Sequence, residues 1–323
     1  MSISTDARRA RAFLQHAAGP TTPVLARYIA DVGPVDAAHH IAECSAPADV
    51  LAESRRHVRW QLADTSLQTV ASLGGRFVVP EDDEWPAVAF AGLSTLAPSG
   101  DTYGGPPVGL WVQGDVRLDE LAAAPSIAIV GSRAATEYGE HHAAEFAYGL
   151  ASRRVPVFSG AAYGIDGAAH GGALAADGVT VAVLGCAVDV GYPAGHVGLL
   201  DRIVRSGGAV VSEYPPGTPL ARHRFLDRNR LVAALTTATL VVEAGRRSGA
   251  RHTARLADKL GRPVLAVPGP VSSVTSAGCH QLIQDGTARL VTSVDDVVAV
   301  IEEGEDADTE PETAVPAAEA GRR

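Results

Sequence analysis

The sequence predicts an α/β protein whose mostly parallel sheet is doubly wound and is preceded by a small helical N-terminal domain. Seven short apolar runs alternate with longer segments rich in Ala, Leu, Arg and Glu, and small or polar residues follow most of the runs. Such alternation is typical of parallel strands joined by right-handed crossovers, with helices on both faces of the sheet. The candidate strands are 127–130, 155–159, 180–184, 209–212, 239–243, 263–267 and 289–292.

Four regions follow one another along the chain. Residues 1–75 carry apolar positions at near-helical spacing and are expected to form the helical domain. Residues 76–126 are rich in Pro and Gly, contain one short apolar strand at 108–112, and are expected to connect that domain to the core. The regular core is expected over 127–301. The acidic segment 302–323 has no aromatic residue and is expected to be disordered.

Composition limits the class of protein. The 323 residues are 46% hydrophobic and 20% charged, which is ordinary for a globular protein with a sizeable core. No apolar run reaches the roughly 18–20 residues of a membrane span, and the first residues lack the apolar region of a secretory signal. The three cysteines, Cys44, Cys186 and Cys279, are widely spread, which argues against a disulfide framework. Together these features predict a protein of the reducing cytoplasm.

The net charge of −10 does not exclude nucleic acid as a ligand. The segment 302–323 holds eight acids and two arginines, so the remainder of the chain carries about −4. Lys259 is the only lysine, and the cationic groups are therefore almost all arginines. Because arginines concentrate in 222–230 and 246–262, a local basic face is compatible with the acidic total.

The first candidate site is the turn Gly131-Ser132-Arg133, which separates the apolar run 127–130 from a segment expected to be helical from about Tyr138. Exposed N–H groups at a helix start and the helix dipole both favour an anion. Arg133 adds a planar guanidinium that suits phosphate. The turn therefore predicts a phosphate-binding pocket beyond the carboxyl ends of the strands, in which Arg133 and the Gly131 and Ser132 amides would hold a phosphate.

A second motif, Ser159-Gly-Ala-Ala-Tyr-Gly-Ile-Asp-Gly-Ala-Ala-His170, follows the next candidate strand. Its small residues would let a ligand approach the backbone, and a helix is expected to begin near Asp166. A tight turn with close helix–sheet packing explains the same residues, so both interpretations stay open. His170 is interpreted as a structural histidine rather than a catalytic one.

A third motif, 223–230, places arginines around one aromatic residue. Guanidinium groups can bind phosphates, and Phe225 can stack on a base of single-stranded nucleic acid. The alternative is a solvated helix face with Phe225 in the core; the nearby phosphate turn favours the binding interpretation. In a fourth motif, Ser248 and Gly249 open a further helix, either as a second phosphate cradle or as an ordinary glycine turn.

The motifs of several enzyme classes are missing from the sequence. It contains no GxxxxGK[ST] loop, no GxGxxG after a strand and no GxSxG nucleophile elbow. Cys279-His280 has no second pair at zinc spacing. No nucleophile stands beside an evident base, so no catalytic residue, metal site or cofactor is predicted.

The motifs in combination resemble the DNA-processing protein A family (DprA, also called Smf). Nine of them stand in the family's order over 127–301, and Glu84-Trp85-Pro86 and 109–115 fit as well. In sequence order they are IAIVGSR with Tyr138-Gly139, SGAAYGIDGAAH, VLGC, Tyr192-Pro193, SEYPPG, FLDRNR, RSGARHTA, VPG and SAGCHQLI.

The resemblance implies a Rossmann-like core, often preceded by a helical SAM-like domain that residues 1–75 would supply. It implies a cytoplasmic, usually dimeric, non-enzymatic protein that binds single-stranded DNA and helps to load the RecA recombinase during natural transformation. Carried over by position and extended along the basic groove, the implied DNA- and phosphate-binding residues are Gly131, Ser132, Arg133, Ser159, Gly160, Arg224, Phe225, Arg228, Asn229, Arg230, Ser248 and Gly249.

The sequence departs from the family pattern at a few positions. Leu226 stands where the family often has Pro, Arg247 replaces a common Lys, and Cys279-His280 stand where Asn is frequent. The acidic segment occupies the place of the winged-helix domain that many members carry, so a member without that domain is expected.

Two alternative functions stay open at this point. A phosphoribohydrolase-like enzyme could use the same pocket on a nucleotide, with Glu243 as the one candidate acid at a strand end. An inactive dimeric scaffold is the other.

Overall fold

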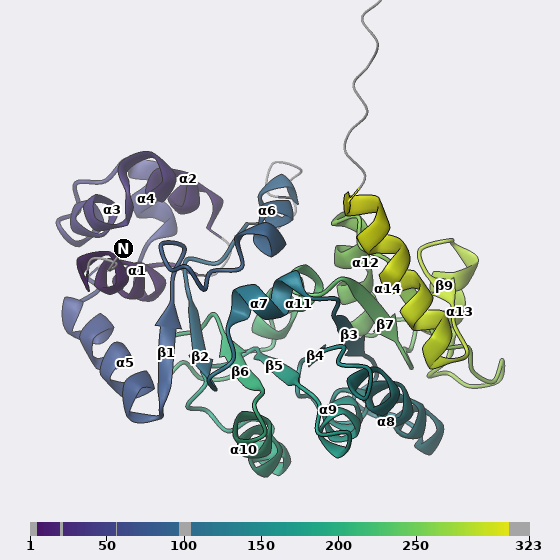
Figure 1. Cartoon of the computed structure of the whole chain (residues 1–323). Helices are drawn as coiled ribbons and strands as arrows, with labels where there is room; N and C mark the ends of the chain where they lie inside the picture. Colours follow the sequence, from purple (N-terminus) through teal and green to yellow (C-terminus); the bar gives the residue numbers. More distant parts are fainter. Residues whose placement is uncertain (1–4, 20–21, 56, 97–104, 310–323) are drawn as a thin grey trace, which may run out of the picture.

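A computed structural model describes residues 5–19, 22–55, 57–96 and 105–309. Within these residues a nine-stranded sheet runs through the molecule in the order β1-β2-β6-β5-β4-β3-β7-β8-β9 (Figure 1). The seven strands from β6 to β9 are parallel to one another, while β1 and β2 pair antiparallel. The predicted doubly wound, mostly parallel α/β fold is therefore confirmed.

The strands are β1 (Gly75–Val78), β2 (Leu110–Gln113), β3 (Ile127–Val130), β4 (Val157–Ser159), β5 (Thr180–Leu184), β6 (Ala209–Ser212), β7 (Ala238–Val241), β8 (Val264–Ala266) and β9 (Arg289–Leu290). The helices of the core are α6 (Ala87–Leu96), α7 (Leu118–Ala123), α8 (Glu137–Ala151), α9 (Ile165–Ala175), α10 (Val197–Arg205), α11 (Arg224–Ala234), α12 (Ala250–Lys259), α13 (Ala277–Gln284) and α14 (Val294–Thr309). The seven predicted strands all occur, with ends that differ by up to two residues.

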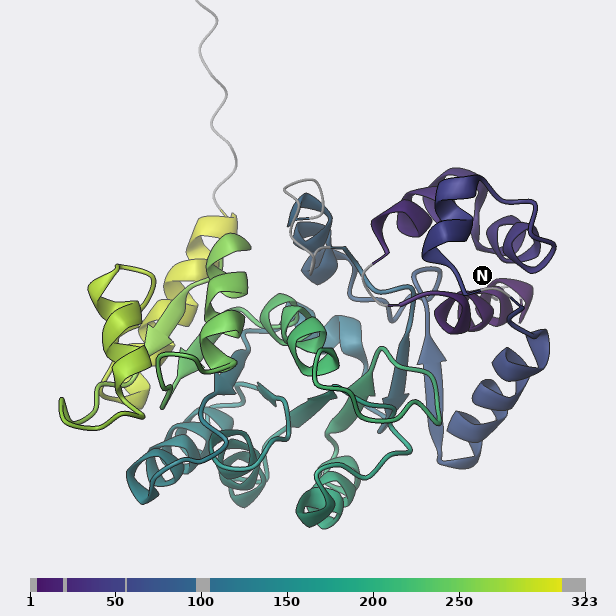
Figure 2. The same cartoon turned by 180° about the vertical axis from the view of Figure 1, so that it is seen from behind.

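The central strands, β3 to β8, are buried on both faces of the sheet, which explains why they read as continuous apolar runs. Along β3, Ile127 and Ile129 join a core cluster with α8, α9 and α14. The alternate residues Ala128 and Val130 join another cluster with α6, α11 and α12. Figures 1 and 2 show these two layers of helices on opposite sides of the sheet.

The N-terminal region is helical, as expected, and it docks against the edge of the sheet. Its helices are α1 (Thr5–Ala17), α2 (Pro23–Val32), α3 (Pro34–Ala42), α4 (Ala48–Glu53) and α5 (Trp60–Ser72). The Trp111 indole N–H donates to Gln15 Oε1 at 2.6 Å, and Gln15 Nε2 donates to the Gly109 carbonyl at 2.6 Å. These bonds attach α1 to β2, and both side chains are buried.

Residues 76–126 connect the N-terminal region to the core and also contribute to the sheet. The strand predicted at 108–112 occurs as β2, whereas β1 was not predicted. β1 pairs with β2, and β2 pairs with β6, so this segment adds two antiparallel strands to the parallel sheet. β1 is only four residues long and its first two residues are half-exposed, which leaves too short an apolar run to read as a strand. At the other end of the chain, α14 continues through residue 309 into the segment expected to be disordered. Residues 310–323 of that segment lie outside the described residues.

No helix in the described residues combines the length and apolar character needed to cross a membrane.

Candidate nucleic-acid interface

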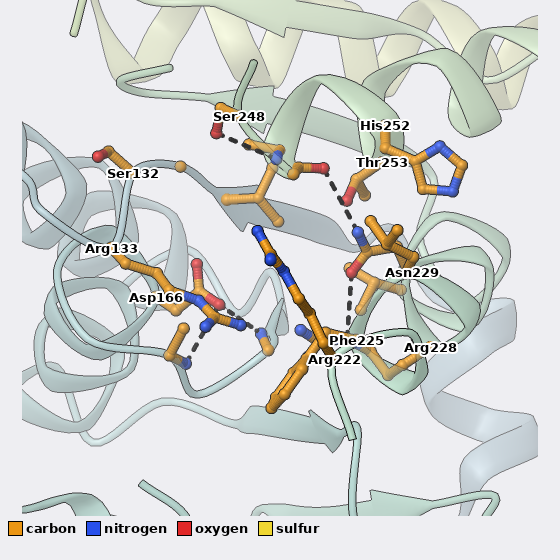
Figure 3. Close-up of a pocket in the computed structure, with 18 of the residues that line it drawn as sticks. Ser132, Arg133, Asp166, Arg222, Phe225, Arg228, Asn229, Ser248, His252 and Thr253 are labelled. Carbon is orange, nitrogen blue, oxygen red and sulfur yellow. Dashed lines mark hydrogen bonds between the residues drawn. The ribbon is translucent and has the colours of Figure 1, made fainter. Parts of the chain in front are cut away.

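A cavity of about 980 Å³ opens where the order of the strands reverses. β3 and β7 are neighbours, and the chain continues outward from β3 through β4, β5 and β6 but from β7 through β8 and β9. The crossovers therefore diverge at this point and leave a crevice at the carboxyl ends of the strands. Figure 3 shows the labelled side chains arranged around that cavity. Of the predicted site residues, those that line it are Gly131, Ser132, Arg133, Gly160, Phe225, Arg228, Asn229, Ser248 and Gly249.

The turn after β3 presents Arg133 to the cavity. The Arg133 side chain is exposed, and its guanidinium carbon lies 4.6 Å from the centroid of the Phe225 ring. Phe225 is half-buried and also packs against Tyr192, with ring centroids 5.6 Å apart. Phe225 therefore belongs neither to the core nor to an open helix face; it forms part of the cavity wall and holds a cation above its ring.

The anion expected at the start of α8 is supplied by the protein itself. The Glu243 carboxylate accepts hydrogen bonds from Thr136 N at 2.9 Å, from Thr136 Oγ1 at 2.7 Å and from Thr275 Oγ1 at 3.0 Å. Thr136 in turn caps α8 by accepting from Gly139 N at 3.2 Å. The Ser132 N–H donates to the Glu243 carbonyl at 2.8 Å. The expectation that the Ser132 amide binds phosphate is therefore corrected, because this amide is already used within the fold.

These contacts also bear on the enzyme alternative that relied on Glu243. The residue is 2% exposed and does not line the cavity. Its carboxylate joins the start of α8 to the loop that precedes α13. Glu243 is thus a structural group behind the turn, and a substrate in the cavity would not reach it.

Arg228 contributes a buried positive charge at the base of the cavity. It is 5% exposed, its Nη1 donates to the Val183 carbonyl, and its Nε donates to Asn229 Oδ1 at 3.2 Å. Burial lowers the pKa of Arg228, and Asp166 opposes that shift. A Cβ on Gly160 would lie 2.0 Å from Arg228 Nη1, so glycine is required there to admit the guanidinium.

Asp166 orders the loop after β4. Its Oδ2 accepts from Gly160 N at 3.2 Å and from Ala162 N at 3.3 Å. Burial raises the pKa of Asp166, and Arg228 is the largest of the influences that counter this shift. Asp166 lies in the first turn of α9, close to the predicted helix start. The second motif therefore serves both as a tight turn and as a wall of the cavity.

The wall opposite Arg133 is formed by α11 and the start of α12 (Figure 3). Asn229 Nδ2 donates to the Gly249 carbonyl at 3.4 Å, which joins the two helices. Gly249 is the N-cap of α12, so the helix predicted to open at Ser248 and Gly249 begins there.

Three predicted site residues do not line the cavity. Ser159 is fully buried, and its hydroxyl donates to the Ile129 carbonyl at 2.6 Å. Arg224 donates to the Pro219 carbonyl and lies 5.2 Å above the Tyr214 ring. Arg230 is 0% exposed, and its Nη1 and Nη2 each donate to a Glu213 carboxylate oxygen at 2.7 Å. The structure therefore corrects the assignment of Ser159 and Arg230 to the binding surface, because both side chains are enclosed in the fold.

Several lining residues were not singled out from the sequence. Arg222 and Arg247 belong to the arginine-rich stretches, and Arg247 also begins the motif RSGARHTA, but neither was assigned to the site. Tyr192, His252 and Thr253 stand in motifs that the sequence analysis quoted without giving these residues a binding role, and Leu220 stands in none. Loops and helix turns distant in the chain bring the four together. Among the residues that the structure describes, the lining holds four arginines and one carboxylate, Asp166, and the cavity is therefore cationic.

His170 is structural, as interpreted from the sequence. The Thr180 hydroxyl donates to the Val157 carbonyl at 2.7 Å, so it accepts from the Nδ1–H of His170, also at 2.7 Å. The ring is fully buried, and this burial lowers the pKa of His170 to about 3.

The buried neutral His170 should make the fold less stable in acid. The unfolded chain takes up a proton near the ordinary histidine pKa of about 6.5, whereas the folded protein does so only near 3. Between these values the free energy of unfolding should fall by about 1.4 kcal/mol for each pH unit of acidification. Urea denaturation of the wild type and of His170→Gln from pH 7 to pH 4 measures this slope. The free energy of unfolding of His170→Gln should fall less steeply with acidification than that of the wild type. Equal slopes for the two proteins would contradict the assignment of His170 as a buried neutral residue.

Comparison of the sequence and the fold with known proteins identifies a family. The family model described as DNA recombination-mediator protein A matches residues 76–302. A putative DNA processing protein DprA from Mycobacterium tuberculosis is 50% identical over 293 residues, which cover 91% of this chain and 75% of the relative. The DNA processing protein DprA of Streptococcus pneumoniae is 42% identical over 196 residues, covering 61% of this chain and 67% of the relative.

Solved structures agree with that assignment. The X-ray structure of DNA processing protein A from Streptococcus pneumoniae superposes with a TM-score of 0.72 at 31% identity, covering 93% of this chain and 98% of the other. A Helicobacter pylori DNA processing protein A, whose structure concerns its single-stranded DNA binding mode, gives a TM-score of 0.56 at 30% identity, covering 62% of this chain and 89% of the other. The chain therefore belongs to the DNA recombination-mediator protein A family, the DprA family of DNA-processing proteins.

Proposed function

We propose that this protein binds single-stranded DNA in the cationic cavity at the switch point of the sheet and acts as a recombination mediator. The observation that carries the proposal is the placement of four arginines and the Phe225 ring around one cavity beyond the strand ends. Guanidinium groups suit the phosphates of an unpaired strand, and the half-exposed ring adds an apolar surface for a base. The relative from Helicobacter pylori, described for its binding of single-stranded DNA, supports the same ligand.

The cavity walls give each group a part in this binding. Arg133, Arg222 and Arg247 would contact the backbone, while buried Arg228 would supply positive potential from below. Ser248 and Gly249 place the start of α12 at the cavity, where the helix dipole also favours an anion.

The proposed role includes a protein partner, the RecA recombinase, and a cellular process, natural transformation. A homodimer of this protein would transfer the bound strand to the RecA recombinase in the cytoplasm during natural transformation. The homodimer would perform no covalent chemistry itself. Membership of a family described as recombination mediators supports this role. RecA filament formation on DNA coated with single-strand binding protein should be faster with this protein than without it. Sedimentation of the free protein should show a dimer.

Removing the Arg133 side chain should weaken binding of oligo(dT) by about 10- to 150-fold. That range corresponds to the loss of one hydrogen bond to a charged group, about 1.5–3 kcal/mol. Fewer counterions should also be released, so the slope of log affinity against log salt should fall by about 0.7. Fluorescence anisotropy at several salt concentrations measures both quantities for Arg133→Ala.

Arg202→Ala is the matched control, because Arg202 is an exposed arginine on α10 that does not line the cavity. It changes the net charge by the same amount and should keep nearly wild-type affinity. Equal affinities of wild type and Arg133→Ala would remove the proposed interface.

A further inference from the structure

Tyr163 is an aromatic side chain that the site described above leaves without a role. It lies in the loop 160–164 between β4 and α9 and is 49% exposed. Its neighbour in the chain, Ala162, lines the cavity. Tyr163 therefore stands at the rim of the cavity with much of its side chain open to solvent.

The loop that carries Tyr163 packs directly on the Arg133 turn. The Ile165 N–H donates to the Ser132 carbonyl at 3.2 Å. Gly164 has φ +72, and a Cβ built on it would lie 2.4 Å from the Ser132 oxygen and 2.8 Å from the Arg133 oxygen. The two backbones therefore touch, and Tyr163 immediately precedes the point of contact.

The tyrosine is held in place although it is exposed. Its hydroxyl oxygen accepts the Gly195 N–H at 3.1 Å. Its ring packs at a steep angle against His196, with centroids 4.8 Å apart and planes at 69°. His196 is fixed in turn, since its Nδ1 donates to the Ala161 carbonyl at 2.9 Å. An aromatic ring fixed before the ligand arrives loses little conformational freedom on binding.

We propose that Tyr163 is a stacking platform for an unpaired base of the strand whose backbone lies in the cavity. The inference rests on the proposed function and adds a base-binding position to it. Phe225 differs from Tyr163 because the Arg133 guanidinium already lies over one face of its ring, 4.6 Å from the centroid, which leaves less of the Phe225 ring for a base. Tyr163 is packed against His196 at a steep angle and half of it is exposed, so its ring offers surface to a base. Bases of any sequence can use such a platform, because every base has a π face.

Two ligands of equal length separate stacking from backbone contacts. Oligo(dT) presents bases and phosphates, whereas an oligomer made only of abasic deoxyribose phosphates presents the backbone alone. Tyr163→Ala should weaken oligo(dT) binding by roughly 5- to 150-fold, the range observed for loss of one base–aromatic stack. The same variant should bind the abasic oligomer as the wild type does. Its salt slope on oligo(dT) should equal that of the wild type, because no phosphate contact is lost.

Two further variants control for structure and exposure. Tyr163→Phe keeps the ring but removes the hydroxyl that accepts from Gly195, and it should bind within about twofold of wild type if stacking carries the effect. Tyr148→Ala removes a tyrosine of similar exposure, 51%, that lies on α8 and does not line the cavity, and it should have no effect. Circular dichroism and thermal unfolding establish that each variant is folded.

The outcomes distinguish this inference from the function on which it rests. If Arg133→Ala weakens binding of both oligomers but Tyr163→Ala binds oligo(dT) like the wild type, the platform is refuted and the DNA interface stands. An equal loss on both oligomers for Tyr163→Ala also refutes stacking. If the wild type binds neither oligomer, or Arg133→Ala binds both as tightly as wild type, the proposed interface fails and the platform fails with it.

Discussion

Glu213→Ala is expected to lower the free energy of unfolding by about 3–5 kcal/mol, the range found when one partner of a buried ion pair is removed. The Glu213 carboxylate receives both terminal nitrogens of Arg230 at 2.7 Å, and the Arg230 side chain is 0% exposed. Without the carboxylate the guanidinium would remain charged in the interior with its principal counterion lost. Chemical denaturation monitored by tryptophan fluorescence gives the change.

Two further variants test whether the expected loss of stability arises from the burial of the ion pair. Asp295→Ala breaks the exposed pair with Arg153, which is of similar length at 2.6 Å, and should cost at most about 1 kcal/mol. The double variant Glu213→Leu/Arg230→Met removes both charges and should be much more stable than the sum of the two single changes predicts. A single Glu213→Ala variant as stable as the wild type would show that the pair is not needed to compensate the buried charge.

Gly164→Ala is expected to destabilise the fold by about 3 kcal/mol and to weaken DNA binding under conditions in which the variant remains folded. The backbone of Gly164 has φ +72 and ψ −126, which a residue with a Cβ adopts only under strain of about 1–3 kcal/mol. The added carbon would also meet the Ser132 carbonyl oxygen at 2.4 Å. Because that oxygen belongs to the turn that carries Arg133, relief of the clash must move the proposed phosphate-binding arginine. Thermal unfolding and anisotropy with oligo(dT) measure the two effects.

Gly171→Ala, a substitution within α9, is a control that should raise the stability of the protein rather than lower it. A Cβ at Gly171 would meet no heavy atom within 4 Å, and the position lies inside α9. Alanine is favoured over glycine in a helix interior, so this change should stabilise the protein by about 0.5–1 kcal/mol and leave DNA affinity unchanged. If Gly164→Ala behaved like Gly171→Ala, the close packing of the two loops would have no energetic consequence.

The parallel part of the fold was predictable because each strand is short, apolar and separated from the next by a helix. The four residues of β3 are all buried, and a run of this kind can be read without knowledge of its neighbours. β1 was missed because only two of its four residues are buried and because β2, which pairs with it, lies more than thirty residues further along the chain. Short strands stabilised by distant partners give little local signal.

The candidate site was predictable at its turns and less so along its helix. Four of the lining residues lie close to a strand end or a helix start: Gly131, Arg133, Gly160 and Ser248. The carboxyl ends of parallel strands meet at one edge of the sheet, so residues in these positions could be expected to lie together. Within α11 the sequence presents several similar arginines, and neither spacing nor charge separates those that reach the cavity from those that do not. Arg228 lines the cavity while Arg230, two residues later, is enclosed with Glu213.

By itself the sequence determined the order of strands and helices, the glycine turns at the strand ends and the concentration of cationic groups in arginine. Only the tertiary structure decided which charges face the cavity and which are used inside the fold. Glu243 reaches Thr136 from 107 residues away, and Glu213 pairs with an arginine 17 residues further along the chain. The order of the strands in the sheet determines which of these distant residues become neighbours. A buried charge is stable only beside its partner, so this packing decides which arginines lie in the interior and which lie at the cavity.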